Sequence, residues 1–80
     1  MVRLRVVSGK EVVGLLGGFG FQVVSQKGSH VKIVRILTDG DRQVLTIPLH
    51  SELDAGTLKA IIRQSSRYIP EESLKKLFYV

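Results

Sequence analysis

The sequence predicts an α+β fold in which one helix precedes a three-stranded antiparallel sheet and two helices follow it. Three observations support this: a helical apolar repeat behind a capping sequence near the N-terminus, apolar strands joined by short turns, and further helical repeats near the C-terminus. Links of hairpin length imply an antiparallel meander. Helices on one face of such a sheet leave its other face open. Eighty residues suffice for one domain, so we expect residues 1–80 to fold as a unit.

The first helix is expected to begin at Ser8. The run Ser8-Gly9-Lys10-Glu11 has the spacing of a capping box, in which the Ser8 hydroxyl and the Glu11 carboxylate each accept from the other residue's backbone N–H. A cluster of glycines then ends the helical repeat. The helix is therefore expected over roughly residues 8–18. Its apolar face consists of Val12, Leu15, Leu16 and Phe19.

The first two strands are expected on either side of a short turn. Residues 21–25 are rich in strand-forming types, and residues 26–28 have the composition of a turn. The clearest strand covers residues 29–37. Alternation places Val31, Ile33 and Leu37 on one face of this strand, and His30, Lys32, Val34 and Ile36 on the other.

A hairpin leads into the third strand. Asp39-Gly40 predicts its turn, because both residue types tolerate a positive φ. The third strand is expected over residues 42–47, and Pro48 is expected to stop it.

Two helices are expected after a polar connection over residues 49–55. Thr57 is the predicted cap of the first, which should run to about Ser66. Its apolar stripe consists of Leu58, Ile61 and Ile62.

The last helix is expected to be short and to have Pro70 at its first position. Its acidic residues, Glu71 and Glu72, fall in the first turn, whereas Lys75 and Lys76 lie towards its end, which complements the helix dipole. The residues expected to dock it on the body are Leu74, Leu77 and Phe78.

Basic residues outnumber acidic ones by twelve to seven, which gives a formal charge of +5. This balance attracts polyanions, nucleic acids first, although it also serves solubility. Two segments, 22–37 and 58–67, contain basic residues and no acid. They predict one or more positive patches, made by Lys27, Lys32 and Arg35 and by Lys59, Arg63 and Arg67.

Several other site types have little support. Cysteine is absent, so disulfides and cysteine-ligated zinc are excluded and a reducing compartment is allowed. His30 and His50 lack a clustered carboxylate, so no metal site is predicted. The glycines at 17–20 follow a helix and lack a P-loop lysine, so no nucleotide cofactor is expected. The longest apolar stretch, residues 12–21, is too short to cross a membrane.

The start of the second strand is the candidate site. His30 and Lys32 lie on the face away from the predicted core, beside Lys27, while Gly28 permits close backbone approach and Ser29 offers a hydroxyl. RNA can be cut without a metal when a base removes the proton of its 2′-OH, a task that suits imidazole at neutral pH. Lysine can stabilise charge on the phosphoryl oxygens. We therefore predict His30 as the base, with a phosphate held at this corner; an exposed histidine without a role is the alternative.

His50, in Ile47-Pro48-Leu49-His50, is a secondary candidate. It has the chemistry to protonate the leaving 5′ oxygen. The alternative, which the sequence favours, is a loop histidine that hydrogen-bonds backbone and fixes the start of the following helix.

The order of these motifs resembles that of the HicA family of toxins. The match covers about residues 6–69, and the order and spacing of its segments are more specific than any segment alone. The segments are Ser8-Gly9-Lys10-Glu11, Gly20-Phe21, Lys27-Gly28-Ser29-His30, Ile47-Pro48-Leu49-His50, Gly56-Thr57-Leu58 and Ile61-Ile62-Arg63-Gln64.

The resemblance implies a fold similar to that of double-stranded-RNA-binding domains and a cytoplasmic endoribonuclease that cleaves mRNA. It places His30 at the position of the family's catalytic histidine, and it implies neutralisation by a HicB-like antitoxin. One departure is Ser66, where family members often have glycine. This difference bears on how the helix before it ends and how the last helix docks.

Two other functions stay open on the sequence. The first is a non-catalytic module that binds A-form RNA through its phosphates and 2′-OH groups, in which Lys27, Lys32 or Arg63 would matter more than His30. The second is an interaction domain whose basic surface receives an acidic protein.

Overall fold

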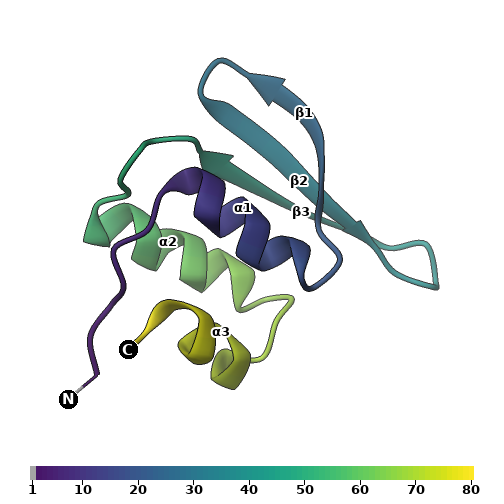
Figure 1. Cartoon of the computed structure of the whole chain (residues 1–80). Helices are drawn as coiled ribbons and strands as arrows, with labels where there is room; N and C mark the ends of the chain where they lie inside the picture. Colours follow the sequence, from purple (N-terminus) through teal and green to yellow (C-terminus); the bar gives the residue numbers. More distant parts are fainter. Residues whose placement is uncertain (1) are drawn as a thin grey trace.

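The computed structural model describes residues 2–80 and has the predicted order of elements (Figure 1). A three-stranded antiparallel sheet in the order β1-β2-β3 follows one helix and precedes two. The elements are α1 (Gly9–Gly17), β1 (Gln22–Lys27), β2 (His30–Ile36), β3 (Arg42–Pro48), α2 (Ala55–Ser65) and α3 (Glu71–Phe78).

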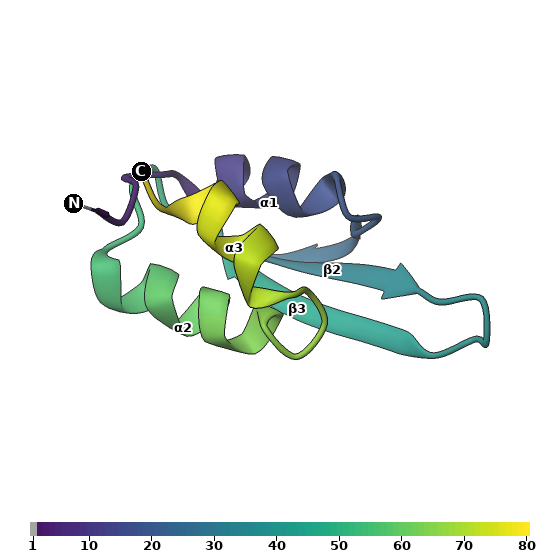
Figure 2. The same cartoon turned by 90° about the horizontal axis from the view of Figure 1, so that it is seen from below.

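All three helices lie on one side of the sheet. Helices α1 and α2 lie next to the sheet, and α3 lies on their far side, so that in the view from below it is seen in front of them (Figure 1 and Figure 2). The loop between β2 and β3 extends beyond the helices. The opposite face of the sheet carries no helix from residues 2–80, which confirms the predicted open face.

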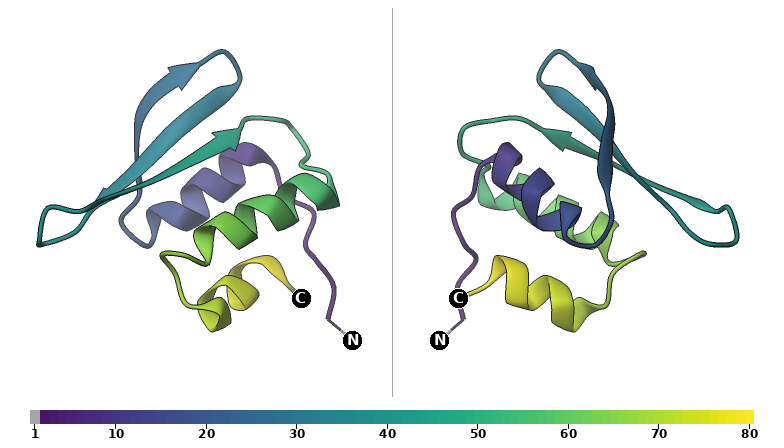
Figure 3. Two further views of the ribbon diagram at one scale, coloured as in Figure 1. Left: turned by 180° about the vertical axis from the view of Figure 1, so that it is seen from behind. Right: turned by 45° about the vertical axis from the view of Figure 1, so that its right-hand side comes forward.

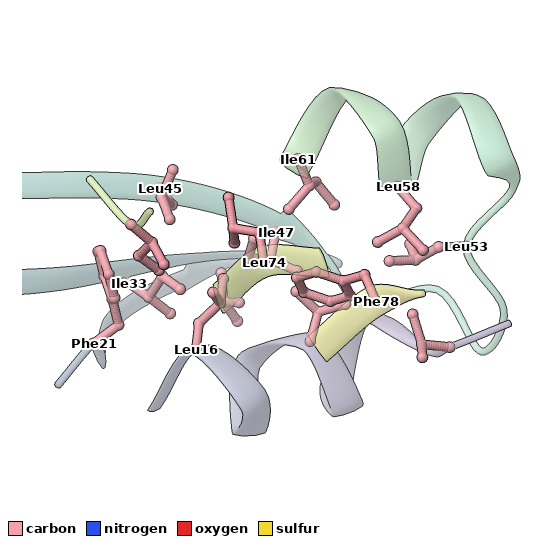
Figure 4. Close-up of a cluster of buried hydrophobic side chains, with 14 residues drawn as sticks. Leu16, Phe21, Ile33, Leu45, Ile47, Leu53, Leu58, Ile61, Leu74 and Phe78 are labelled. Carbon is pink, nitrogen blue, oxygen red and sulfur yellow. The ribbon is translucent and has the colours of Figure 1, made fainter. Parts of the chain in front are cut away.

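The apolar core fills the space between the sheet and the helices (Figure 4). Ile33, Leu45 and Ile47 enter it from β2 and β3, where strand alternation points them towards the helices. Helices α1 and α2 contribute residues at helical spacing, and α3 closes the core with Leu74 and Phe78. Apolar residues of all three helices and of two strands are therefore withdrawn from water together.

The capping box at Ser8 is present with both of its hydrogen bonds. The Ser8 hydroxyl accepts from the Glu11 N–H, and the Glu11 carboxylate accepts from the Ser8 N–H, each at 3.0 Å. Of the predicted apolar face of α1, Val12 and Leu16 are fully buried, while Leu15 and Phe19 are partly buried against the core. The predicted first helix is thus confirmed in position and in orientation.

The first strand is longer than predicted. It continues through Gln26 and Lys27, which the sequence places in a turn, because Lys27 pairs with His30 and leaves a loop of only two residues. Phe21 precedes the strand and is buried in the core. An irregularity in pairing between Val23 and Ser25 leaves Val24 without a partner on β2, as a β-bulge does.

Strands β2 and β3 agree with the prediction to within one residue at each end. Val31 and Ile33 face the core, and His30 and Lys32 face solvent. Val34 was expected to be exposed with these two residues, but only 5% of it is accessible, because Gln22 and Val44 flank it across the sheet. Pro48 does not lie beyond the end of β3 but is its last residue, which an edge strand allows.

Thr57 is not the cap of α2, so this prediction is wrong. The N-cap is Asp54, whose carboxylate accepts from the Thr57 N–H at 2.6 Å. Asp is a stronger cap than Thr and also complements the positive end of the helix dipole. The helix ends at Ser65, close to the prediction. Ser66 has a φ of −65°, which any residue adopts, so the absence of glycine there does not disturb the end of α2.

The docking of α3 is confirmed. Leu74 and Phe78 are buried and Leu77 is partly buried. Pro70 is the N-cap rather than the first helical residue, a difference of one position. The acidic first turn and basic last turn are present, and Glu71 pairs with Lys75 across one turn at 3.6 Å.

The two ends of the chain pair with each other, which the sequence did not reveal. Arg3 and Val80 exchange backbone hydrogen bonds of 2.7 and 2.8 Å, and Leu4 bridges Tyr79. Figure 3 shows the two termini side by side in both views. This pairing holds the N-terminal segment and the end of α3 together.

Alanine substitutions at Gly9 and Gly14 should have opposite effects on stability. A Cβ at Gly9 would overlap the carbonyl oxygen of Pro48 and lie 2.8 Å from Cα of Leu49, whereas a Cβ at Gly14 meets nothing within 4 Å. We expect Gly9→Ala to lower the free energy of unfolding by about 2 kcal/mol. Gly14→Ala, in the same helix, should raise it by about 0.5–1 kcal/mol. Urea denaturation measures both, and equal effects would contradict the close contact at Gly9.

Acidification should weaken the cap of α2. The hydrogen bonds from Thr57 hold the pKa of Asp54 below its ordinary value of 3.8. Because the folded-state pKa is lowered, the stabilisation is present above that ordinary value and is lost as the pH falls through the folded pKa. Asn caps almost as well but does not titrate. The difference between the urea midpoints of the wild type and Asp54→Asn should therefore change as the pH falls below 3.8, and a constant difference would refute this coupling.

Candidate active site

The β1–β2 turn brings Lys27 and His30 opposite each other. The two residues are strand partners, so their side chains lie on the same face of the sheet. Only Gly28 and Ser29 lie between them, and Gly28 has a φ of 60° at the first central position, where a type II′ hairpin turn takes glycine. The amide Nε2 of Gln26 donates to the Gly28 carbonyl at 3.0 Å. The turn thus fixes the lysine and the histidine as cross-strand neighbours.

His30 and Lys32 lie on the open face of the sheet, as the sequence predicted. Both are exposed, and the alternation of β2 points the intervening Val31 into the core. Residues two apart on a strand are separated by about 7 Å. Lys27, His30 and Lys32 therefore form a compact group, which we call the His30 cluster.

The cluster is basic and its charges are not neutralised. Among residues 2–80 the one ion pair joins Glu71 and Lys75 on α3. The acidic residues Asp39 and Asp41 lie at the other end of β2, in the loop before β3. The free lysines create a positive potential around the imidazole, which favours the approach of an anion.

The end of β3 brings His50 to the same corner. Pro48 is the strand partner of His30, and the Leu49 N–H donates to the Ser29 carbonyl one residue further along. His50 follows directly, beyond the end of β3, and its side chain is exposed. The structure therefore places the two histidines, which are 20 positions apart in the sequence, in one region.

His50 does not fix the start of α2 in the way that the sequence favoured. Its backbone carbonyl accepts from the Gly9 N–H at 2.9 Å, so it anchors the start of α1. In the described part of the chain, its exposed imidazole has no hydrogen-bond partner. The hydrogen bonds from Thr57 are the main cause of the lowered pKa of Asp54, and the nearby charge of His50 adds a smaller effect. The imidazole is thus available to a ligand.

Arg35, which the sequence grouped with the basic residues of segment 22–37, is half-buried on the other face. It points towards the helices because it shares the face of Ile33. Its guanidinium donates to the carbonyls of Phe19 and Tyr68 at 3.1 and 2.9 Å, and its Nε donates to Gln43 at 2.7 Å. It also lies 5.0 Å from the centre of the Phe21 ring. Arg35 is thus a structural tie and not part of a ligand-binding patch.

Arg42, unlike Arg35, lies on the open face of the sheet, and the sequence did not single it out as a site residue. It pairs with Ile36 at the far end of β2, so it shares the face of His30 and Lys32. The sequence does contain a signal for this position. Ile36 alternates onto the same face as Lys32, and the length of the hairpin loop determines that Arg42 lies opposite Ile36. The open face therefore carries three cations and one imidazole along the length of the sheet.

Within residues 2–80, no three His, Cys, Asp or Glu side chains gather closely enough to hold a metal ion. No helix in the same range is long and apolar enough to cross a membrane.

The arrangement supplies a proton acceptor and two cations around one accessible point. Imidazole can accept a proton near neutral pH, and ammonium groups can stabilise growing negative charge on phosphoryl oxygens. An exposed corner also suits a long polyanion better than a small molecule, which binds in concave pockets. The chemistry available here is proton transfer beside a phosphate.

Comparison with known proteins gives one family assignment. The family model described as the HicA toxin of bacterial toxin–antitoxin systems matches residues 9–66. This range contains the β1–β2 turn, the His30 cluster and His50. No curated protein matches the chain in sequence.

Substitution of Gly28 should strain the turn without steric conflict. Its φ of 60° disfavours side chains, although a Cβ added to this residue would meet nothing within 4 Å. We expect Gly28→Ala to lower the free energy of unfolding by about 1 kcal/mol. Gly28→Asn should cost less, because Asn tolerates this region. Denaturation curves of the two variants provide the test, and an unchanged Gly28→Ala would argue against the left-handed turn.

Proposed function

The chain belongs to the HicA toxin family of toxin–antitoxin systems, and on this basis we propose that it is an endoribonuclease that cleaves mRNA, with His30 as the catalytic residue. The observation that carries the proposal is the exposed imidazole of His30 between two free lysines, Lys27 and Lys32. Family membership makes the chain a toxin, and the His30 cluster offers a chemical means of toxicity.

The proposed reaction requires no metal. His30 accepts the proton of an RNA 2′-OH, and the 2′ oxygen forms a bond to the adjacent phosphorus. The bond from phosphorus to the 5′ oxygen breaks, which leaves a 2′,3′-cyclic phosphate and a 5′-hydroxyl. Lys27 and Lys32 stabilise the negative charge on the phosphoryl oxygens while these bonds change.

The 5′ oxygen needs a proton as it leaves, and His50 is our candidate for the donor. Support comes from its position beside the strand partner of His30 and from its exposed, unpartnered imidazole within residues 2–80. His30 on one side of the phosphate and His50 on the other would divide the work of base and acid.

Gly28 and Ser29 complete the proposed RNA contact. The turn is exposed, and the lack of a side chain at Gly28 lets the RNA backbone approach closely. The exposed Ser29 hydroxyl is a hydrogen-bond donor that could bind a phosphate oxygen. The proposed activity belongs in the cytoplasm, where mRNA is found, and a HicB-like antitoxin is the proposed partner that silences it.

The deciding experiment compares the wild type with His30→Ala on a long single-stranded RNA in EDTA. We expect the wild type to cleave and the variant to lose about 100- to 10 000-fold in rate, because general base catalysis contributes that much. Gel electrophoresis measures the rate, and the chemistry of the fragment ends identifies the cyclic phosphate. Circular dichroism and RNA binding of His30→Ala test whether the variant is folded.

Other outcomes would change the assignment. Equal cleavage by both proteins would remove His30 from the reaction and make His50→Ala the next variant. Binding without cleavage by either protein would favour the non-catalytic RNA-binding module. Lys32→Gln removes a charge from the cluster, and Lys76→Gln on α3 is its control for the loss of net charge alone.

A further inference from the structure

Strand β1 is the least covered element of the fold. It forms one edge of the sheet, and all six of its residues are exposed. Two of them, Val23 and Val24, are apolar and expose 51% and 53% of their surface. The outer edge of such a strand presents backbone N–H and C=O groups to which another strand can pair.

A groove lies between β1 and α1, on the helix side of the sheet. Its volume is about 490 Å³ and its lining is mostly apolar. The lining residues are Lys10, Val13, Val23, Gln26, Val31 and Leu49.

The groove does not suit the RNA backbone. It opens on the opposite side of the sheet from His30 and Lys32, because Val23 and Val31 have the reverse strand parity. Lys10 is the one cation in its lining, and the apolar side chains there offer no donor to a phosphate. Apolar surface beside an unpaired strand edge favours a polypeptide instead.

Charge indicates what kind of polypeptide would fit. Lys10 lines the groove, Lys27 ends β1, and neither has an ion-pair partner within residues 2–80. The whole chain carries a formal charge of +5. A segment with apolar residues facing the groove and acidic residues near each lysine would match both.

We propose that the β1 edge and the groove beside it form the docking surface for an extended segment of the antitoxin. The segment adds to the sheet as a fourth strand beside β1, places apolar side chains against Val23 and Val13, and sets acidic side chains near Lys10 and Lys27. The proposal rests on the family assignment that also underlies the proposed function.

Docking at this edge would also silence the His30 cluster. Strands in a sheet are about 4.8 Å apart, so a strand beside β1 lies roughly 10 Å from β2. Lys27 ends β1 as the partner of His30, and a strand that runs to this end brings its acidic residues to the cluster. It would compete with an RNA phosphate for Lys27.

The test uses Val23→Glu with Val6→Glu as its matched control. Both valines are exposed, and Val6 lies beside the C-terminal Val80 rather than at β1. Calorimetry measures the affinity of each full-length variant for the antitoxin of the same toxin–antitoxin pair. We expect Val23→Glu to weaken binding by at least about 30-fold, the effect of an interface hot spot, and Val6→Glu to leave it unchanged. Lys10→Glu is the second variant, since it reverses a charge on an exposed residue without altering the core.

Two results would overturn the proposal. One is wild-type antitoxin affinity in both Val23→Glu and Lys10→Glu. The other is loss of RNA cleavage with antitoxin binding intact, which would assign the groove to RNA. The binding titration contains no RNA, so it tests the docking surface even if the chain does not cleave RNA. The proposed docking surface and the proposed endoribonuclease activity can therefore fail separately.

Discussion

The site depends on a backbone contact between the first turn of α1 and the end of β3. Gly9 donates to the His50 carbonyl and lacks the Cβ that would otherwise meet the Pro48 carbonyl. Leu49 then donates to Ser29, which links the same segment to the β1–β2 turn. Three segments distant in the sequence are joined at this corner by main-chain atoms, and the two histidines owe their proximity to that join. The side chains at the corner are therefore free for a ligand.

The two faces of β2 divide its charges between structure and function. Arg35 on the helix side satisfies its guanidinium with Phe19, Tyr68 and Gln43, and so ties the segments that follow α1 and α2 to the sheet. Lys32 on the open side has no ion-pair partner within residues 2–80. A guanidinium withdrawn from water without partners would cost several kcal/mol, whereas an exposed lysine keeps its hydration and its charge for an incoming anion. Strand parity alone separates the two roles.

The proposed catalytic cluster and the proposed antitoxin surface use opposite faces of the same hairpin. Lys27 belongs to both, since it ends the edge strand and partners His30. A protein partner can therefore gain affinity from the apolar groove beside β1, which RNA does not need. The same partner still competes with RNA for Lys27. Inhibition then does not require the antitoxin to imitate RNA across the whole open face.

Local patterns in the chain were sufficient to predict the elements, their order and the face of β2 that carries His30, because alternation, helical spacing and capping involve near neighbours. Short contiguous motifs such as Lys27-Gly28-Ser29-His30 were likewise sufficient to indicate the family. Features that depend on distant residues emerged only from the folded chain. They are the partners of Arg35, the pairing of the chain ends and the contact of the Pro48–His50 segment with the β1–β2 turn. A local pattern states which way a side chain points, but the packing of distant segments determines what that side chain meets.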